Sequence, residues 1–530
     1  MAFLISCNEE GQIVNPELQG DSDWHLKDLE KDTVPGISLE RAYKELIQPN
    51  SGEEIIVAVI DTQVDLSHED LNGQIYINPN EIENNGVDDD TNGYIDDVHG
   101  WNFLGYGKHS SLEYSLYDHT RIVKRLQNKF KDRKKEDVEP KDMAEYLKYL
   151  KAAKSHNKSI VDAEELLQAS SKYKDLYIQI KERFSDRFPL YDSYFQYNLD
   201  TVTPRNEEEE KLLKYLKRFK TAGLDLETLF KEEKYAIIQK YTSNNLNYNE
   251  RKQLGDNPYD YDNGNYGNNN VQASQQRIHG TQVSGIIAAN RSNGTGIKGA
   301  SNRIKLMVLP IFTIKGNEHD KDFYNAVRYA VDNGARVINF SSGKPMVDNE
   351  HLVFNALKYA ENNNVLVVTS SGNSASDIDK PEHNSYPMDL GPNGNTVGNL
   401  IKVGSSSRYL DNRIYSSFSN YGKQNVDVFA PGEGIRTTTS HENRYHENVE
   451  GTSISSALTS GVAALLLSQY PDLNAIQVKN ILMESGTEYD VLVKTRENDS
   501  VPFKELSKSG KVLNAYNALK MAAGIISSKK

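Results

Sequence analysis

Residues 53–61 read Glu-Glu-Ile-Ile-Val-Ala-Val-Ile-Asp, six consecutive apolar side chains that end at a carboxylate. An apolar run without alternation is typical of a parallel strand that is covered on both faces. Asp61 then lies at the carboxyl end of that strand, the edge at which open parallel sheets bind their ligands. The run therefore predicts a central strand with a functional side chain at its end.

Similar apolar runs recur in the second half of the chain and alternate with helical patterns. Apolar residues at helical spacing mark residues 323–333 and 352–362. Further strands are predicted at residues 304–309, 337–340, 365–369, 400–404 and 426–430. This alternation predicts an α/β protein, with a mostly parallel central sheet flanked by helices.

A long insertion separates the first strand from the others. Residues 106–243 are rich in Lys, Glu, Leu and Tyr, and far exceed what a crossover between parallel strands requires. Their apolar residues recur at helical spacing, as in Met143, Leu147 and Leu150, and again in Leu212, Leu216 and Phe219. We therefore expect an inserted helical subdomain.

Composition divides the rest of the chain. Residues 244–269 are dominated by Asn, Tyr, Asp and Gly, cannot bury much apolar surface and are expected to form a linker or an ion-binding loop. Residues 1–50 precede the first strand and are expected to be an N-terminal extension. The α/β domain is then discontinuous and consists of residues 51–105 and 270–525.

Net charge and cysteine content limit the partners. The 530 residues include 61 basic and 75 acidic side chains, for a formal charge of −14, so no nucleic-acid partner is expected. No run approaches the roughly 20 apolar residues that span a bilayer, so no transmembrane segment is expected. Cys7 is the only cysteine, which excludes an internal disulfide and favours a bound cation as a stabilising element.

Three side chains suited to nucleophilic catalysis lie at predicted strand ends or helix starts. Ser453 follows Gly451-Thr452 and opens an apolar helical segment, His279 opens another, and Asp61 ends the first strand. A serine hydroxyl needs a base with a pKa near 7, and the imidazolium that forms needs a fixed carboxylate. We expect Ser453 to attack, His279 to take its proton and Asp61 to orient His279.

These segments together resemble the subtilisin-like serine peptidases (subtilases), in which the triad runs Asp, His, Ser along the chain. Residues 417–422, 429–432 and 510–515 are also similar to the family. Gln282 replaces a usual second histidine and Ala457 a usual proline, and neither position carries the chemistry. The resemblance covers residues 51–105 and 270–525. It implies a three-layer subtilisin-like fold and a serine endopeptidase that forms an acyl-enzyme.

The resemblance also implies how substrate is held. Asn373 follows Ser370-Ser371-Gly372 as in the oxyanion segment of subtilases, and would act together with the backbone amide of Ser453. An extended protein or peptide substrate would pair with the strand edge. The expected substrate-binding positions are Ser341, Ser342, Gly343, Ser371 and Gly372. The alternative is a catalytically silent relative that serves as a surface binding protein, with the helical insertion carrying the interaction.

An acidic loop follows the first strand. Residues 88–97 read Asp-Asp-Asp-Thr-Asn-Gly-Tyr-Ile-Asp-Asp, with oxygen donors spaced much as in an EF-hand loop. Such hard ligands suit calcium, although the twelfth position is His99 and not glutamate. The expected ligands are Asp88, Asp90, Asn92, Tyr94, Asp96 and Asp97. The alternative is an Asx-rich turn without a metal.

The first residues suggest a lipid anchor. Cys7 follows Leu4-Ile5-Ser6, which resembles the lipobox of bacterial lipoproteins. It implies acylation at Cys7 and a location in the cell envelope or outside the cell; the alternative is an ordinary thiol. About 50 residues precede the first strand, few for an inhibitory propeptide. The helical insertion is therefore expected to assist folding or to gate the cleft.

Overall fold

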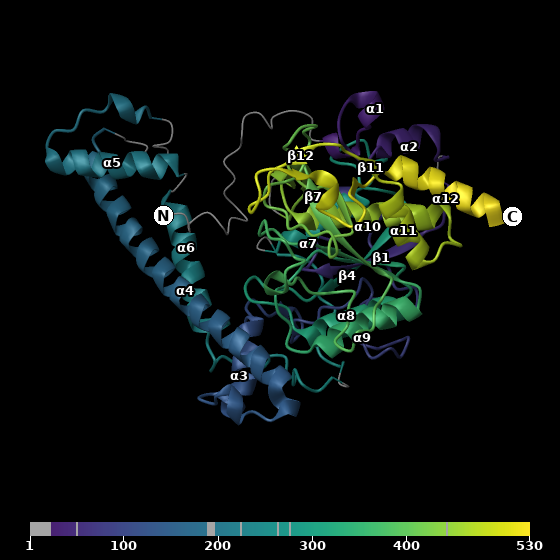
Figure 1. Cartoon of the computed structure of the whole chain (residues 1–530), viewed down its shortest axis with the longest axis horizontal. Helices are drawn as coiled ribbons and strands as arrows, with labels where there is room; N and C mark the ends of the chain where they lie inside the picture. Colours follow the sequence, from purple (N-terminus) through teal and green to yellow (C-terminus); the bar gives the residue numbers. More distant parts are fainter. Residues whose placement is uncertain are drawn as a thin grey trace. The chain divides into compact units, whose positions relative to one another are not determined.

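The computed structural model describes residues 23–48, 51–187, 197–222, 225–261, 264–274, 277–440 and 444–529. Cys7 lies outside these residues. Contacts between Cα atoms divide the described chain into two units. The helical unit contains residues 114–249, and the core unit contains residues 23–113 and 250–529 (Figure 1).

An eight-stranded sheet runs through the core unit in the order β11-β14-β8-β7-β6-β5-β1-β4. All neighbouring strands are parallel except β11 and β14. The strands are β1 (Ile55–Asp61), β4 (Ile304–Pro310), β5 (Val337–Phe340), β6 (Leu366–Ser370), β7 (Leu400–Ser406), β8 (Val428–Pro431), β11 (Thr487–Glu488) and β14 (Lys511–Val512). The mostly parallel sheet confirms the predicted α/β class.

Side chains of β1 alternate between two hydrophobic cores. Val57 and Val59 lie in one core and Ala58 and Ile60 in the other, which explains the unbroken apolar run. Residues of α7, α10, α11 and α12 share the first core, and those of α8 and α9 the second (Figure 1). These helices are α7 (His279–Ala288), α8 (Asp320–Asp332), α9 (Glu350–Asn362), α10 (Thr452–Gln469), α11 (Ala475–Glu484) and α12 (Ala515–Lys529).

The segment before β1 packs on the sheet. Trp24 is fully buried, and its indole N–H donates to the carbonyl oxygens of Glu433 (3.2 Å) and Gly434 (3.3 Å). Two short helices follow, α1 (Leu29–Asp32) and α2 (Leu39–Glu45). Three small hairpins complete the core unit: β2 (Gly105–Tyr106) with β3 (Ser110–Ser111), β9 (Ile435–Thr438) with β10 (Tyr445–Val449), and β12 (Leu492–Val493) with β13 (Val501–Pro502).

The polar tract at residues 244–269 is packed more tightly than its composition suggests. The side chains of Arg251 and Asp256 are 3% and 0% exposed and form an ion pair of 2.5 Å. Tyr266 is buried in the same core as Ala58. Charge pairing and one aromatic ring, neither of which composition reveals, hold the part of the tract that contains Arg251, Asp256 and Tyr266 within the core unit.

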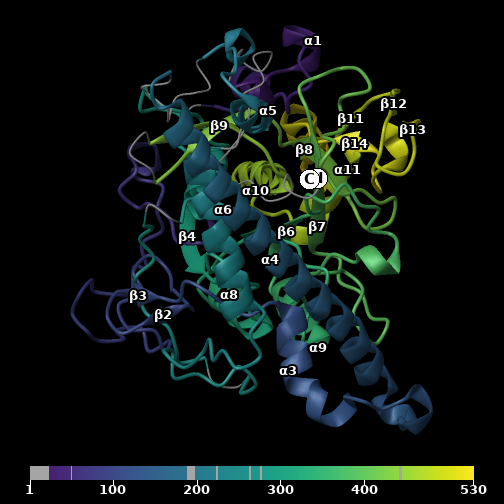
Figure 2. The same ribbon diagram turned by 90° about the vertical axis from the view of Figure 1, so that its left-hand side faces the viewer.

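The helical unit is built on one long helix, α4 (Met143–Phe184). It packs with α3 (Asp118–Phe130), α5 (Glu207–Thr221) and α6 (Leu226–Ile238) (Figure 2). A small core unites α4 with α5 and includes Tyr177, Ile180, Phe184, Leu212, Leu216 and Phe219. The inserted helical subdomain confirms that part of the predicted fold class.

One predicted apolar face of α4 is turned outward. Leu147 and Leu150 are 51% and 44% exposed, whereas Tyr146 and Tyr149 are buried. Both tyrosine rings pack against Phe130 of α3. The centroid of the Phe130 ring lies 5.6 Å from that of Tyr146 and 6.0 Å from that of Tyr149. The packed face of α4 is therefore set by aromatic contacts with α3 and not by the spacing of its leucines. None of the helices in the described chain combines the length and hydropathy that a membrane crossing requires.

Candidate active site

Three neighbouring strands end at the same edge of the sheet. β1 pairs with β5 so that Val59 is opposite Asn339, and continuing this register brings Asp61 level with Ser341. β5 pairs with β6 so that Phe340 is opposite Thr369, which brings Ser341 level with Ser370. Because neighbouring strands lie about 4.8 Å apart, the polar residues at these ends are adjacent.

Asp61 and His279 form a close pair at this edge. Nδ1 of His279 lies 2.8 Å from Oδ1 and 2.9 Å from Oδ2 of Asp61. The Asp61 side chain is fully buried, whereas that of His279 is 26% exposed. A carboxylate bonded to Nδ1 fixes the tautomer in which Nε2 is the basic nitrogen.

Gly280 allows α7 to begin against the loop that follows β1. Its N–H donates to Oγ1 of Thr62 at 2.8 Å. A Cβ at this position would lie 2.5 Å from the carbonyl oxygen of Thr62 and 2.7 Å from that of Gln63, closer than atoms approach. The pair His279-Gly280 therefore brings the imidazole to the end of β1 because the next residue has no side chain.

Ser453 is the second residue of α10 and is fastened to the end of β5. Its hydroxyl donates to the carbonyl oxygen of Ser341 at 3.1 Å, and Oγ of Ser341 donates to the carbonyl oxygen of Ser453 at 3.1 Å. Ser456 adds a second bond to the Ser453 carbonyl at 2.9 Å. Gly451 has φ 151°, which favours glycine at the turn into the helix.

Asn373 is oriented by the residue that precedes Ser453. Its Oδ1 accepts hydrogen bonds from the N–H (3.0 Å) and the hydroxyl (2.8 Å) of Thr452. The side chain of Asn373 is exposed, so its Nδ2 group is available at the surface as a donor. Thr452 was not singled out from the sequence, although its position beside Ser453 was the available signal.

The predicted substrate-binding residues fall into two groups. Ser371 and Gly372 bond within the protein: the Ser371 N–H donates to Val403 and the Gly372 N–H to the Thr452 hydroxyl. They shape the wall of the site and do not offer those groups to a peptide. Ser341, Ser342 and Gly343 follow the end of β5 at the edge. Ser342 is also bonded within the protein, since its N–H donates to the carbonyl oxygen of Phe340 at 2.8 Å and its own carbonyl oxygen accepts from the Thr369 hydroxyl at 2.7 Å. A Cβ at Gly343 would lie 2.6 Å from Oγ of Ser385, which identifies Ser385 as a further wall residue.

A cluster of three carboxylates lies in the loop after β1. One ligand atom from each of Glu81, Asp90 and Asp97 lies within 4.8 Å of the others, so the cluster could hold a metal ion. Asp90 and Asp97 are among the predicted ligands, and Glu81 was missed because it lies outside the EF-hand spacing. Asn92 bonds to both aspartates through its amide N–H₂ group, at 3.1 and 3.0 Å.

The other predicted ligands have different surroundings. The Asp88 carboxylate accepts hydrogen bonds from the backbone of Asn92 and Gly93. The Asp96 carboxylate accepts from the backbone of Asn85 and Gly86. The Tyr94 ring packs against Trp101, with centroids 5.1 Å apart. The Asp88 and Asp96 carboxylates thus stabilise the turns of this loop through hydrogen bonds from the backbone.

Burial and mutual repulsion act on the carboxylate cluster. Burial raises the pKa of Asp97, and the negative charge of Asp90 raises it further, against the lowering effect of a hydrogen bond from Tyr329. Burial likewise raises the pKa of Glu81, with added repulsion from Asp97 and Asp90. A divalent cation would relieve this repulsion, so the donor set fits a hard metal ion.

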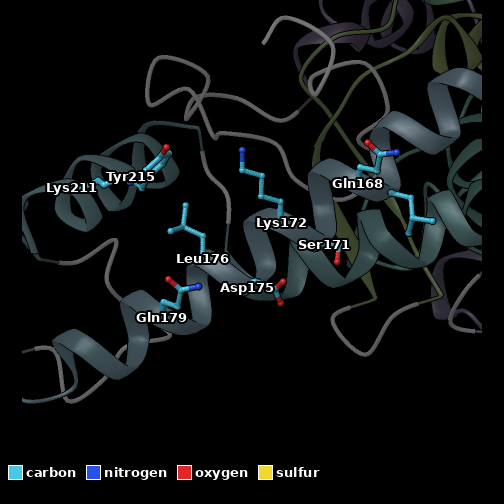
Figure 3. Close-up of a pocket in the computed structure, with 9 residues that line it drawn as sticks. Gln168, Ser171, Lys172, Asp175, Leu176, Gln179, Lys211 and Tyr215 are labelled. Carbon is cyan, nitrogen blue, oxygen red and sulfur yellow. The ribbon is translucent and has the colours of Figure 1, made fainter. Parts of the chain in front are cut away.

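A groove in the helical unit has different chemistry. It is lined by residues of α4 and α5, with Leu176 and Tyr215 beside Lys172 and Asp175 (Figure 3). Its residues belong to the helical unit, whereas Asp61, His279 and Ser453 belong to the core unit. The candidate catalytic residues therefore do not line this groove.

A mostly parallel sheet, with an Asp–His pair and a serine-bearing helix at its carboxyl edge, is the arrangement of subtilisin-like folds. The chain belongs to the Subtilase family, which it matches over residues 52–505. It is 36% identical to the thermophilic serine proteinase of Bacillus sp. (strain AK1) over 208 residues, which cover 39% of this chain and 46% of that one. It is 30% identical to subtilisin DY of Bacillus licheniformis, over 39% of this chain and 70% of the relative.

Among solved structures, a protease of Pseudoalteromonas arctica PAMC 21717 aligns with a TM-score of 0.38 and 25% identity. That alignment covers 46% of this chain and 70% of the other. For the two relatives compared by sequence, the chain spans about half the length of the Bacillus sp. proteinase and a larger share of subtilisin DY.

Proposed function

We propose that the protein is a serine endopeptidase that cleaves proteins or peptides through an Asp61–His279–Ser453 triad. Membership of the subtilase family supports the activity in general. The observation that carries the assignment of residues is the Asp61–His279 pair at the end of β1. The register of β1 and β5 brings Asp61 level with Ser341, and the Ser453 hydroxyl is bonded to the Ser341 carbonyl. In this proposal residues 51–105 and 270–525 form the peptidase domain, and residues 106–243 form its insertion.

In the proposed reaction, the Ser453 hydroxyl leaves the Ser341 carbonyl by rotation about its Cα–Cβ bond and donates to Nε2 of His279. His279 takes the proton as Oγ attacks the scissile carbonyl, and Asp61 stabilises the imidazolium. His279 then gives the proton to the leaving amine, and water hydrolyses the acyl-enzyme by the same route.

The developing oxyanion would be held by the backbone N–H of Ser453 and by Nδ2 of Asn373. The amide of Ser453 lies in the first turn of α10, where helix N–H groups lack intrahelical partners. The two bonds from Thr452 support the role of Asn373, because they fix the carbonyl end of its side chain and leave the amino end as donor.

We propose calcium as the ion of the acidic loop, in a stabilising role. Glu81, Asp90 and Asp97 would hold it, because their oxygens are hard ligands close to one another. Asp88, Asn92, Tyr94 and Asp96 then contribute by shaping the loop or through atoms that move on binding. The cation supplies charge compensation and takes no part in peptide hydrolysis.

We also propose that the enzyme acts in the cell envelope or outside the cell, anchored through Cys7. The lipobox-like Leu4–Cys7 run supports this, and one relative is named a cell wall-associated protease of Bacillus subtilis, although another is named a major intracellular serine protease. Labelling of cells with a palmitate analogue tests it: Cys7→Ser should abolish labelling and release the protein from membranes.

The experiment that tests the enzymatic function is active-site labelling with a fluorophosphonate. We expect the full chain to be labelled, and Ser453→Ala to abolish both labelling and cleavage of a casein substrate. Ser455→Ala, two residues further into α10, is the matched control and should keep the label. A folded wild-type protein that takes up no label would instead support a silent binding protein.

A further inference from the structure

The two chain segments that join the helical unit to the core unit are both bonded to residues 314–322. Glu113 precedes the helical unit, and its carbonyl oxygen accepts a hydrogen bond of 2.8 Å from the N–H of Ile314. Glu250 follows the helical unit, and its Oε1 lies 2.7 Å from Nε2 of His319. The Glu250 and His319 side chains are 6% and 9% exposed, so this pair is buried.

Buried ion pairs extend this attachment into α8. Arg251 contacts both oxygens of Asp322, at 2.8 and 2.9 Å, and Asp256 lies 2.5 Å from Nζ of Lys321. All four side chains are 3% exposed or less. Removing one member of such a pair leaves an uncompensated buried charge. Residues 250–256 and the start of α8, all within the core unit, are therefore joined by buried charges.

The same stretch holds the predicted peptide-binding edge through Lys344, the residue after Gly343. Nζ of Lys344 lies 2.8 Å from Oδ1 of Asp320 and donates to the carbonyl oxygen of Glu318 at 3.0 Å. The Lys344 side chain is 6% exposed. Its backbone pairs with Tyr386 in both directions, at 3.1 and 2.8 Å. Lys344 thus joins the edge to two other segments.

We propose that Lys344 is a positioning residue for the peptide-binding edge, and that the Glu250–His319 pair makes the position of that edge depend on the exit segment of the helical unit. This rests on the proposed peptidase function, in which residues 341–343 align the peptide that Ser453 attacks. Strand addition needs N–H···O distances of about 2.7–3.2 Å, so a small displacement of the edge weakens peptide binding.

The first test replaces Lys344 with Met, which keeps the length of the side chain and removes its charge. KM for a peptide substrate should rise about tenfold with little change in kcat, while the rate of fluorophosphonate labelling should not change. The small probe reports on Ser453 and needs no strand pairing. Lys344→Arg keeps the charge, and its KM should lie within about twofold of the wild-type value.

The outcomes separate this inference from the function on which it rests. Wild-type protein without labelling or cleavage overturns the peptidase function itself. Wild-type activity together with an unchanged peptide KM in Lys344→Met overturns the role of Lys344. A fall in labelling that matches the fall in peptide cleavage also overturns it, because Lys344 would then act on the whole site. If Lys344→Met does not fold, Asp320→Asn provides the same comparison with a smaller change.

The second test concerns the connection to the helical unit. Glu250→Gln should raise the peptide KM about threefold, and combining it with Lys344→Met should add little, because both act through residues 318–320. Glu209→Gln is the matched control: Glu209 is a 2% exposed glutamate of the helical unit, paired with Arg187 at 2.6 Å. Two results would overturn the role of the Glu250–His319 pair. One is an equal shift in KM in Glu250→Gln and Glu209→Gln, and the other is full additivity of the KM shifts in the Glu250→Gln/Lys344→Met double variant.

Discussion

Buried ion pairs fasten the segment after the helical unit to the core unit's α8, whereas most ion pairs of the helical unit are exposed; the Asp118–Arg121 pair, with both side chains 4% exposed, is an exception. Arg251 and Asp322 of the core unit are 3% and 0% exposed and pair at 2.8 Å. In the helical unit, Glu145 lies 3.0 Å from Arg125 and 2.8 Å from Lys129, with side chains 29–42% exposed. Exposed pairs are worth about 0–1 kcal/mol, whereas breaking a buried pair costs about 3–5 kcal/mol.

The difference shows where this chain needs rigidity. The candidate triad depends on strand ends, such as that of Asp61, that must not shift relative to one another. Buried pairing between segments that are distant in sequence keeps them in place. The helical unit has its own small core around Tyr177 and carries most of its charge in water. Substitutions in the two units should therefore differ in effect by orders of magnitude.

The largest expected effect comes from Asp61→Asn. This variant keeps the shape of the side chain but favours the wrong imidazole tautomer, so kcat on a peptide substrate should fall about 10⁴-fold, or about 5.5 kcal/mol. Glu145→Gln in the helical unit should leave kcat within twofold. Steady-state kinetics at pH 7–8 measure both. A loss below tenfold in Asp61→Asn would contradict the triad.

Asn373→Ala removes the proposed oxyanion donor of the core unit. Losing one oxyanion donor should lower kcat by 10²–10³, about 2.7–4 kcal/mol, with KM nearly unchanged. Asn363→Ala is the control, since Asn363 is an exposed asparagine whose side chain donates to the carbonyl oxygen of Tyr359 at the end of the preceding helix. Should both variants keep wild-type kcat, the oxyanion would have to be held by other groups.

Calcium removal tests the loop after β1. Calcium at 100 times its Kd should stabilise the folded protein by about 2.7 kcal/mol and raise Tm by several degrees over a chelated sample. Glu81→Gln should reduce this rise, and exposed Glu83→Gln should not. Differential scanning fluorimetry measures both, and equal Tm values with calcium and with chelator would rule out the site.

The calcium effect should grow with pH. The folded-state pKa values of Glu81 and Asp97 are raised, so ionising these groups destabilises the cation-free protein as pH rises through those values. The ionised cluster also binds a cation more tightly. The difference in Tm between calcium and chelator should therefore be larger at pH 8 than at pH 5, and the reverse order would contradict the assignment.

The smallest expected effect is that of Glu145→Gln on stability. Its pairs with Arg125 and Lys129 are exposed, so the free energy of unfolding should fall by less than about 1 kcal/mol, and the difference should shrink at 1 M salt. Urea denaturation measures it. A loss above 2 kcal/mol would mean that the helical unit is as sensitive to charge as the core unit.

Sequence patterns predicted the parallel strands and the helices beside them because buried strands need unbroken apolar runs. They also marked Asp61, His279, Ser453 and Asn373, since each adjoins a strand end or a helix start. Hydrogen bonds between distant segments had no such signal. Glu81 joins the acidic cluster from outside the recognised loop, and Lys344 gains its partners only when residues 318–320 fold beside it.

The order of the strands has a consequence for synthesis on the ribosome. β1 pairs with β4 and β5, and β4 begins about 250 residues after β1, beyond the whole helical unit. At about 5–20 residues per second, translation takes roughly 12–50 s to supply the first partner strand. For that time the nascent apolar segment Ile55–Ile60 has no sheet to join. An apolar strand left unpaired during synthesis is prone to aggregation, so we expect chaperones to bind this segment of the nascent chain.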